Sequence, residues 1–180
     1  MRLFIAVDLP EEVRSYLGSF KSLFPDLHGK VSWVRPENIH ITLKFLGEVA
    51  DSKTAGIAER LNKIKFLTFS LTLNTFGFFP RENALRVFWI NFVAAARLRA
   101  LSREIDKVLP EFRNDRSFKD HVTLARIKTV SPLERSSFLE KISSLQLERK
   151  EFVVDKFVLY RSTLTPRGSV YEPIFSFKSC

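Results

Sequence analysis

Two of the three histidines occur in the same short pattern, a histidine and a threonine separated by one apolar residue. The pattern reads HITL at residues 40–43 and HVTL at residues 121–124. Side chains alternate between the faces of a β-strand, so each pattern would place an imidazole beside a hydroxyl. An imidazole titrates near pH 6.5 and a hydroxyl can donate a hydrogen bond, so each unit pairs a proton carrier with an anion ligand. The third histidine, His28, lacks the pattern and is interpreted as a surface residue.

Two such units facing each other suit the cleavage of a phosphodiester. One of His40 and His121 would take a proton from the attacking water or hydroxyl, and the other would protonate the leaving oxygen. Thr42 and Thr123 would donate hydrogen bonds to the phosphate oxygens. We expect no metal and no cofactor, because the single cysteine is the last residue and no His-Glu-x-x-His pattern occurs.

The composition is typical of one basic globular domain covering residues 1–180, with no linker-like segment. The 29 Lys and Arg residues exceed the 20 Asp and Glu residues, giving a net charge of +9. Such a surface attracts polyanions such as nucleic acid, although the charge-rich surface of a thermophile is an alternative explanation. No apolar run reaches the length of a membrane span, and a single cysteine is typical of a reducing compartment. We therefore expect a cytoplasmic protein with no membrane partner.

Strands and helices mix along the chain without the strict alternation of a doubly wound parallel sheet, which predicts an α+β fold. Alternating and β-branched or aromatic runs predict strands at residues 3–9, 31–34, 40–46, 69–76, 85–90, 122–127, 152–160 and 171–177. Helical spacing of apolar residues predicts helices over 10–24, from a cap at Asp51 or Ser52 to residue 64, over 94–109 and over 132–145. The two histidine patterns fall on strands in different halves, which indicates two lobes built on one plan.

Further segments extend these patterns into a resemblance that spans nearly the whole chain. They are RLFIAVDLP at residues 2–10, NIHITLKFLGE at 38–48, HVTLAR at 121–126, and LYRS at 159–162 with residues 168–172 after it. With them the sequence resembles the two-histidine (2H) phosphoesterase superfamily. Within that superfamily it is similar to the RNA 2′,3′-cyclic phosphodiesterases, also called 2′-5′ RNA ligases.

The resemblance implies a bilobal fold in which two antiparallel sheets face each other across a central cleft. The helices would lie outside, and a pseudo-two-fold axis would relate the two lobes. It implies His40 as proton donor and His121 as proton acceptor, with Thr42 and Thr123 on the phosphate. Water would open an RNA 2′,3′-cyclic phosphate end to a 2′-phosphate. In the reverse direction an RNA 5′-hydroxyl end would form a 2′-5′ linkage. We expect a monomer in which hydrolysis dominates, because opening the strained ring in water is downhill.

Two cationic residues are candidates for substrate binding. Lys44 shares the His40 face under strict alternation and would add positive potential there. Arg126 falls on the face opposite to His121, so a twist or a strand end is needed before it could clamp a phosphate. Asp120, at a position where related sequences often carry proline, is interpreted as pointing away from the histidine face.

Aromatic side chains are candidates for stacking on RNA bases. Phe4 and Tyr171 are the main candidates, and Trp33 and Phe79 are two others. Because the chain has 18 phenylalanines, most of them are expected to lie in the core.

Two other functions remain open from the residues alone. The same pair of patterns would serve a phosphodiesterase for another cyclic phosphate or for a 2′-5′ oligonucleotide. A non-catalytic RNA-binding module is also compatible with the charge and the aromatics, although binding does not require two titrating residues beside hydroxyls. A P-loop or Rossmann nucleotide protein is excluded, because the chain has no glycine-rich phosphate loop.

Overall fold

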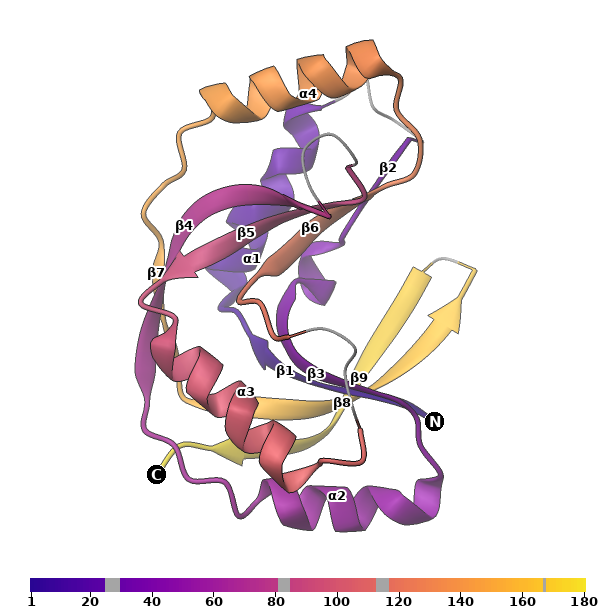
Figure 1. Cartoon of the computed structure of the whole chain (residues 1–180), viewed down its shortest axis with the longest axis vertical. Coiled ribbons are helices and arrows are strands. Elements are labelled where there is room, and N and C mark those ends of the chain that lie inside the picture. The colour runs from indigo at the N-terminus through magenta and orange to yellow at the C-terminus, as the bar shows by residue number, and fades with distance from the viewer. Residues whose placement is uncertain (25–29, 81–84, 113–116, 167) are drawn as a thin grey trace.

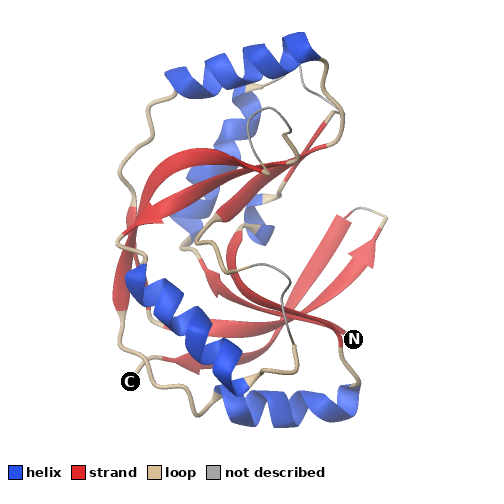
Figure 2. Ribbon diagram, in the orientation of Figure 1, coloured by secondary structure: helices blue, strands red, loops and turns tan. Residues whose placement is uncertain are grey.

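A computed structural model describes residues 1–24, 30–80, 85–112, 117–166 and 168–180, and His28 lies outside them. Two antiparallel sheets form the body, and the helices cover their outer sides (Figures 1 and 2). The four-stranded sheet has the order β3 (His40–Glu48), β1 (Arg2–Asp8), β8 (Lys156–Thr165), β9 (Gly168–Lys178). The five-stranded sheet has the order β2 (Val31–Trp33), β6 (Val122–Ile127), β5 (Val87–Val93), β4 (Phe69–Phe79), β7 (Glu151–Val154).

The described residues contain four α-helices, which are divided between the two sheets. Figure 1 shows α1 (Glu11–Ser19) and α4 (Pro132–Ser144) beside the five-stranded sheet, and α2 (Thr54–Leu61) and α3 (Ala96–Val108) beside the four-stranded one. Helix α1 thus follows β1 but covers the other sheet, and α3 follows β5 but contacts β3. The two lobes are therefore intertwined along the chain. Among the described residues, no helix is long and apolar enough to cross a membrane.

The sequence-based elements are largely confirmed. The strand at residues 122–127 has the predicted bounds, and α4 begins at Pro132 as predicted. A capping box starts α4, in which the Ser131 hydroxyl accepts from the Glu134 backbone N–H and the Glu134 carboxylate accepts from the Ser131 N–H. Strand β8 ends at Thr165 and β9 begins at Gly168, with Arg167 outside the described residues.

Two predicted boundaries are wrong. Residues 152–160 do not form one strand, because the chain leaves the five-stranded sheet after β7 and enters the four-stranded sheet at β8, with Asp155 between them. Both halves carry strand-forming residues, so their composition does not show the change of sheet. The second helix begins at Thr54 after a 3-10 turn, and neither Asp51 nor Ser52 caps it with a side chain.

Phe88 on β5 is the centre of the core between the five-stranded sheet and α4. Its fully buried ring lies 5.3–6.1 Å, centroid to centroid, from the rings of Phe76, Phe78, Phe138 and Trp33. Aromatic rings at such separations contribute beyond their buried area. Trp33 is half-buried and packs against this core, beside Phe24 and Phe88, which does not fit its predicted role in base stacking.

We predict that Phe88→Ala lowers the free energy of unfolding by about 3–5 kcal/mol, because it leaves a cavity among four aromatic rings. Urea denaturation followed by far-ultraviolet circular dichroism would measure this loss. Phe88→Leu keeps most of the buried volume and should cost much less. A loss below about 1 kcal/mol for Phe88→Ala would contradict the central position assigned to this ring.

Candidate active site

His40 is the first residue of β3, and hydrogen bonds hold both of its ring nitrogens. Its Nδ1 lies 2.7 Å from the carbonyl oxygen of Asn38, and its Nε2 lies 2.9 Å from the hydroxyl of Thr42. A carbonyl oxygen can only accept, so Nδ1 carries the proton and Nε2 is left for chemistry. The Asn38 side chain donates in turn to the carbonyl of Ser169 on β9, at 2.8 Å, which ties this turn to the four-stranded sheet.

His121 stands directly before β6 and is held in the same way. Its Nδ1 lies 2.7 Å from the carbonyl oxygen of Lys119, so Nδ1 carries the proton here too and Nε2 does not. The edge of its ring faces Phe79, with 5.0 Å between the centroids, and Trp89 lies beyond at 6.3 Å. The Trp89 indole packs over Gly77, where a Cβ would come within 2.2 Å of the ring, so glycine is required there.

The two imidazoles come from different sheets that meet along β3 and β6. These two strands contact each other. The contact between β3 and β6 brings the two lobes together next to the two patterns. The charge of His121 lowers the pKa of His40. His40, Thr42, His121 and Thr123 are all half-buried.

Each histidine strand contains a β-bulge one residue after its threonine. Thr42 faces Ala6 and Lys44 faces Ile5, so Leu43 is the extra residue of β3. In β6, Thr123 faces Trp89 and Ala125 faces Phe88, so Leu124 is extra. A bulge inserts one residue and reverses the alternation that follows. We call the side of each sheet that carries its histidine and threonine the histidine face.

The bulge at Leu43 removes Lys44 from the histidine face. Lys44 is 3% exposed and forms an ion pair with Asp106 of α3 on the other side of the sheet. The prediction that it shares the face of His40 is therefore wrong, and so is the solvated alternative. Phe45 takes the place on the histidine face instead, opposite Phe4 of β1.

The bulge at Leu124 has the opposite effect on Arg126. It brings this residue onto the histidine face beside Thr123, where it is exposed. Strict alternation had placed Arg126 on the face opposite to His121, so an irregular strand was needed to bring it to the histidine face. The bulge at Leu124 is that irregularity. Arg126 is also close enough to His121 for its charge to lower the pKa of that imidazole.

Phe4 lies on the histidine face but is only 3% exposed. Its ring centroid is 5.0 Å from that of His40, 5.2 Å from Tyr160 and 4.9 Å from Tyr171. Phe4 therefore packs against the His40 ring. Because its own ring is covered by these neighbours, the expectation that it stacks on a base is wrong. Tyr171 is half-buried with its ring 5.3 Å from His40, while Phe79 has a similar place beside His121.

Burial lowers the pKa of both histidines, and their charged neighbours differ. For His40, the Asn38 carbonyl and the negative charge of Asp8 raise the pKa, whereas His121 lowers it. For His121, the Lys119 carbonyl and Asp120 raise the pKa, whereas the charges of Lys119 and Arg126 lower it. The carboxylate of Asp120 is itself paired with Arg99, at 2.9 Å. One carboxylate thus acts on each histidine, Asp8 on His40 and Asp120 on His121, and the positive charges of Lys119 and Arg126 act on His121 as well.

Asp8 is a site residue that the sequence reasoning missed. It is the last residue of β1 and lies opposite His40 in the register of β1 and β3. The hydroxyl of Tyr160 donates to its Oδ1 at 2.7 Å, and burial of that tyrosine raises the pKa of its phenol. The available signal was alternation on the first strand, which places Asp8 on the same face as Phe4.

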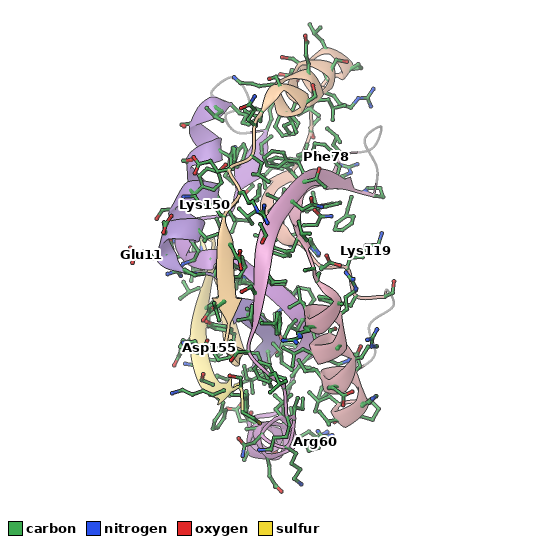
Figure 3. The ribbon with its side chains drawn as sticks, turned by 90° about the vertical axis from the view of Figure 1, so that its left-hand side faces the viewer. Glu11, Arg60, Phe78, Lys119, Lys150 and Asp155 are labelled. Atoms are coloured by element: carbon green, nitrogen blue, oxygen red, sulfur yellow. The ribbon has the colours of Figure 1, made fainter. Side chains whose placement is uncertain are left out.

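A cavity of about 450 Å³ opens at the His40 end of the site. Phe4, Tyr160 and Tyr171 line it next to His40. Its charged lining residues are Asp8, Glu11, Arg14, Glu37, Asp155 and Lys156, and Figure 3 shows Glu11 and Asp155 on the same side of the molecule. Within the described ranges, no group of three or more His, Cys, Asp or Glu side chains could hold a metal ion.

Comparison with known proteins identifies the relatives of this chain. The family model described as LigT-like phosphoesterase matches residues 7–89 and 93–171. A protein of Archaeoglobus fulgidus named RNA 2′,3′-cyclic phosphodiesterase is 37% identical, covering 99% of this chain and 100% of its own length. One of Thermotoga maritima with the same name is 36% identical, covering 97% and 94%.

Solved structures agree with this result. The crystal structure of TT0787 of Thermus thermophilus has a TM-score of 0.79 and 31% identity, covering 99% of this chain and 97% of its own. The apo form of E. coli LigT has a TM-score of 0.78 and 26% identity, covering 99% and 96%.

We predict that both His40 and His121 titrate below pH 6.5 in the folded protein and are protonated on Nδ1 when neutral. Burial disfavours the charged imidazole, and the two backbone carbonyls fix the tautomer. Nitrogen-15 NMR of the imidazoles across pH would report both properties, with His40→Ala and His121→Ala spectra providing the assignments. A midpoint above 6.5 for either residue, or an Nε2-protonated neutral form, would contradict this geometry.

Proposed function

The chain is an enzyme that belongs to the LigT-like phosphoesterase family, and we propose that it is an RNA 2′,3′-cyclic phosphodiesterase that opens the cyclic phosphate to a 2′-phosphate. The observation that carries the proposal is the matched pair of imidazoles. Each has Nδ1 fixed on a backbone carbonyl, so that Nε2 carries no proton, and each is followed by a β-bulge one residue after its threonine. The names of its relatives support RNA as the substrate.

In the proposed mechanism His121 is the proton acceptor and His40 the proton donor. Nε2 of His121 takes a proton from a water molecule, whose oxygen attacks the phosphorus. The bond between phosphorus and the ribose O3′ breaks, and Nε2 of protonated His40 delivers its proton to O3′. Thr42 and Thr123 donate hydrogen bonds to the non-bridging oxygens, on which charge develops. The products are a 2′-phosphate and a free 3′-hydroxyl, and proton exchange with solvent restores both imidazoles.

The assignment of donor and acceptor rests on the residue that stands opposite each histidine. Asp8 lies opposite His40. When the register of β5 and β6 is continued one residue past the pair Ile90 and Val122, Asn91 lies opposite His121. A carboxylate favours a charged imidazole and a neutral amide does not. Asp8 on β1 thus favours the protonated form of His40, which suits a proton donor. Asn91 on β5 leaves His121 neutral, which suits a proton acceptor.

The same site would act as a ligase when an RNA 5′-hydroxyl end replaces the attacking water: His121 takes the proton of that hydroxyl, its oxygen bonds to phosphorus, and the P–O3′ bond breaks with O3′ protonated by His40. The 2′,3′-cyclic phosphate end is then joined to it through a 2′-5′ linkage. Hydrolysis is expected to dominate, because water is in large excess and opening the strained ring is downhill. We also propose that the enzyme acts as a monomer in the cytoplasm, since one chain supplies both histidines and both threonines.

We predict that the protein, in the presence of EDTA, converts a short RNA with a 2′,3′-cyclic phosphate end into the same RNA with a 2′-phosphate. His40→Ala and His121→Ala should each lower kcat by about 100-fold or more, because each removes one proton transfer. Gel analysis of end-labelled RNA, with authentic 2′- and 3′-phosphate standards, identifies the product. As the matched control, the affinity of the His40→Ala variant for the same RNA is measured by fluorescence anisotropy. It should differ little from that of the wild type.

Two outcomes of this assay would contradict the proposal. A 3′-phosphate product would mean that the leaving oxygen is O2′. RNA that binds and is returned unchanged would favour either another cyclic phosphate substrate, including a 2′-5′ oligonucleotide, or a non-catalytic RNA-binding function.

We predict that Asp8→Asn reduces activity on the alkaline side of the pH profile and leaves the acidic side unchanged. The carboxylate raises the pKa of His40, so its removal lowers that pKa. A donor with a lower pKa is deprotonated at a lower pH, which reduces the active fraction only above that pKa. Asparagine retains an oxygen that accepts from the Tyr160 hydroxyl, so this hydrogen bond is preserved.

Asn91→Asp is the matched variant in the other lobe, because it places a carboxylate opposite His121 instead. It should raise the pKa of the acceptor and reduce activity on the acidic side only. The measurement is kcat/KM across pH for both variants. A gain of activity on the acidic side in Asp8→Asn, with the alkaline side unchanged, would identify His40 as the acceptor and reverse the roles.

A further inference from the structure

We propose that Arg99 of helix α3 is a positioning residue for His121, which holds the carboxylate of Asp120 and offsets its charge beside the imidazole. This inference rests on the function proposed above, in which His121 is the proton acceptor. It assigns a task to a residue of α3 that acts on the imidazole through Asp120.

Arg99 and Asp120 form a partly buried ion pair. Nη1 of Arg99 lies 2.9 Å from Oδ1 of Asp120, and the Asp120 side chain is only 17% exposed. A charged hydrogen bond that is partly withheld from water is stronger than a fully exposed ion pair. Asp120 stands between His121 and Lys119, whose carbonyl accepts from Nδ1 of the imidazole. The ion pair therefore holds the short segment that carries the imidazole and sets its tautomer.

The same face of α3 is anchored on β3, which gives Arg99 a fixed base. Ser102 and Asp106 follow Arg99 at three and seven residues, so the three side chains lie on one side of the helix. The Ser102 hydroxyl donates to the carbonyl of Leu43 at 3.4 Å, and Asp106 forms an ion pair with the buried Lys44. Helix α3 thus reaches from the four-stranded sheet to the segment before His121 in the other lobe.

The start of α3 departs from the usual preferences of a helix N-terminus in two ways. Its first four residues include Arg97 and Arg99 and no acidic residue, although the helix dipole favours negative charge there. Ala94, between β5 and α3, has a φ of 58°, in the left-handed region that a non-glycine residue adopts at a cost. Such local costs are retained where the surrounding contacts determine the structure. Asp120 supplies the negative partner that the helix itself lacks at this end.

The charge of Arg99 distinguishes the two carboxylates that act on the histidines. Asp8, which raises the pKa of His40, accepts a hydrogen bond from a neutral tyrosine hydroxyl. Asp120 also raises the pKa of His121, but it is paired with a cation. The carboxylate in the second lobe is therefore partly neutralised, and the carboxylate in the first lobe keeps its full charge.

Apart from Asp120, the groups around His121 in the described part of the chain are cationic or neutral at neutral pH. They are Lys119 on the same segment, Arg126 on β6, His40 on β3, Phe79 on β4, and Trp89 and Asn91 on β5. Removing the Arg99 charge leaves the Asp120 carboxylate without its counter-charge, which raises the pKa of the imidazole. An acceptor with a higher pKa is protonated at a higher pH, so activity falls on the acidic side of the profile alone.

The test uses variants that separate charge from packing. Arg99→Met removes the charge and keeps an unbranched side chain, whereas Arg99→Lys retains a cation. The double variant Arg99→Met with Asp120→Asn removes both charges of the ion pair. Arg103→Met is the matched control, because Arg103 is exposed on the same helix and its loss removes the same charge. Each variant is assayed for kcat/KM across pH on the cyclic phosphate RNA, and the pKa of His121 is measured by nitrogen-15 NMR.

Arg99→Met is expected to raise the pKa of His121 by about half a pH unit. It should lower kcat/KM by about 3-fold on the acidic side and leave the alkaline side unchanged. Arg99→Lys and the double variant should return both properties close to those of the wild type, and Arg103→Met should match the wild type.

An equal loss of activity at every pH, with the pKa of His121 unchanged, would assign Arg99 a role in folding alone and would overturn the proposal. A pKa that stays raised in the double variant would overturn it as well, because the effect would not pass through Asp120. If the wild type does not turn over the RNA, the proposed function fails, whereas the NMR titration reports separately whether Arg99 acts on His121 through Asp120.

Discussion

A backbone carbonyl oxygen can only accept a hydrogen bond, and the geometry of this site depends on that limit. The carbonyls of Asn38 and Lys119 each receive Nδ1–H from the histidine two residues later. Both imidazoles are thereby held in one tautomer with Nε2 outward, before any substrate arrives. The rest of the fold serves to keep those carbonyls and rings in place. Phe4 lies against the His40 ring, Phe79 against the His121 ring, and the Asn38 side chain is tied to β9.

Equal positioning alone would give two interchangeable histidines, yet general acid–base cleavage needs one group charged and the other neutral. The difference comes from the neighbouring strands. Asp8 lies opposite His40, and the register of β5 and β6, continued one residue past Ile90 and Val122, puts the neutral Asn91 opposite His121. Lys119 and Arg126 add positive charge near His121. Local backbone geometry therefore makes the two halves alike, and a few side chains on adjacent strands make them chemically distinct.

Residue spacing predicts the parts of this molecule that follow a regular period. The α+β fold, most of the strands and the helix from Pro132 were predicted on that basis. The paired histidines and threonines were also predicted to share a face, which the structure bears out. The alternation of apolar and polar residues does not reveal a β-bulge. The bulge at Leu43 is therefore the reason why Lys44 was predicted on the wrong face and Phe45 was not considered. The bulge at Leu124 is the reason why the face of Arg126 could not be decided from the sequence. Phe4 was misjudged for a different reason. Its face was right, but its burial depends on Tyr160 and Tyr171, which lie far away in sequence.

The arrangement of the four-stranded sheet has a consequence for how the protein is made. Strand β1 is synthesised first, but one of its two neighbours, β8, is among the last segments to leave the ribosome. Until then β1 can pair only with β3, and its other edge is open. Tyr160 and Tyr171, which enclose the His40 ring together with Phe4, also belong to this last segment. A nascent chain therefore contains His40 and His121 long before Tyr160 and Tyr171 can pack around the His40 ring. Catalytic competence is consequently acquired only near the end of translation.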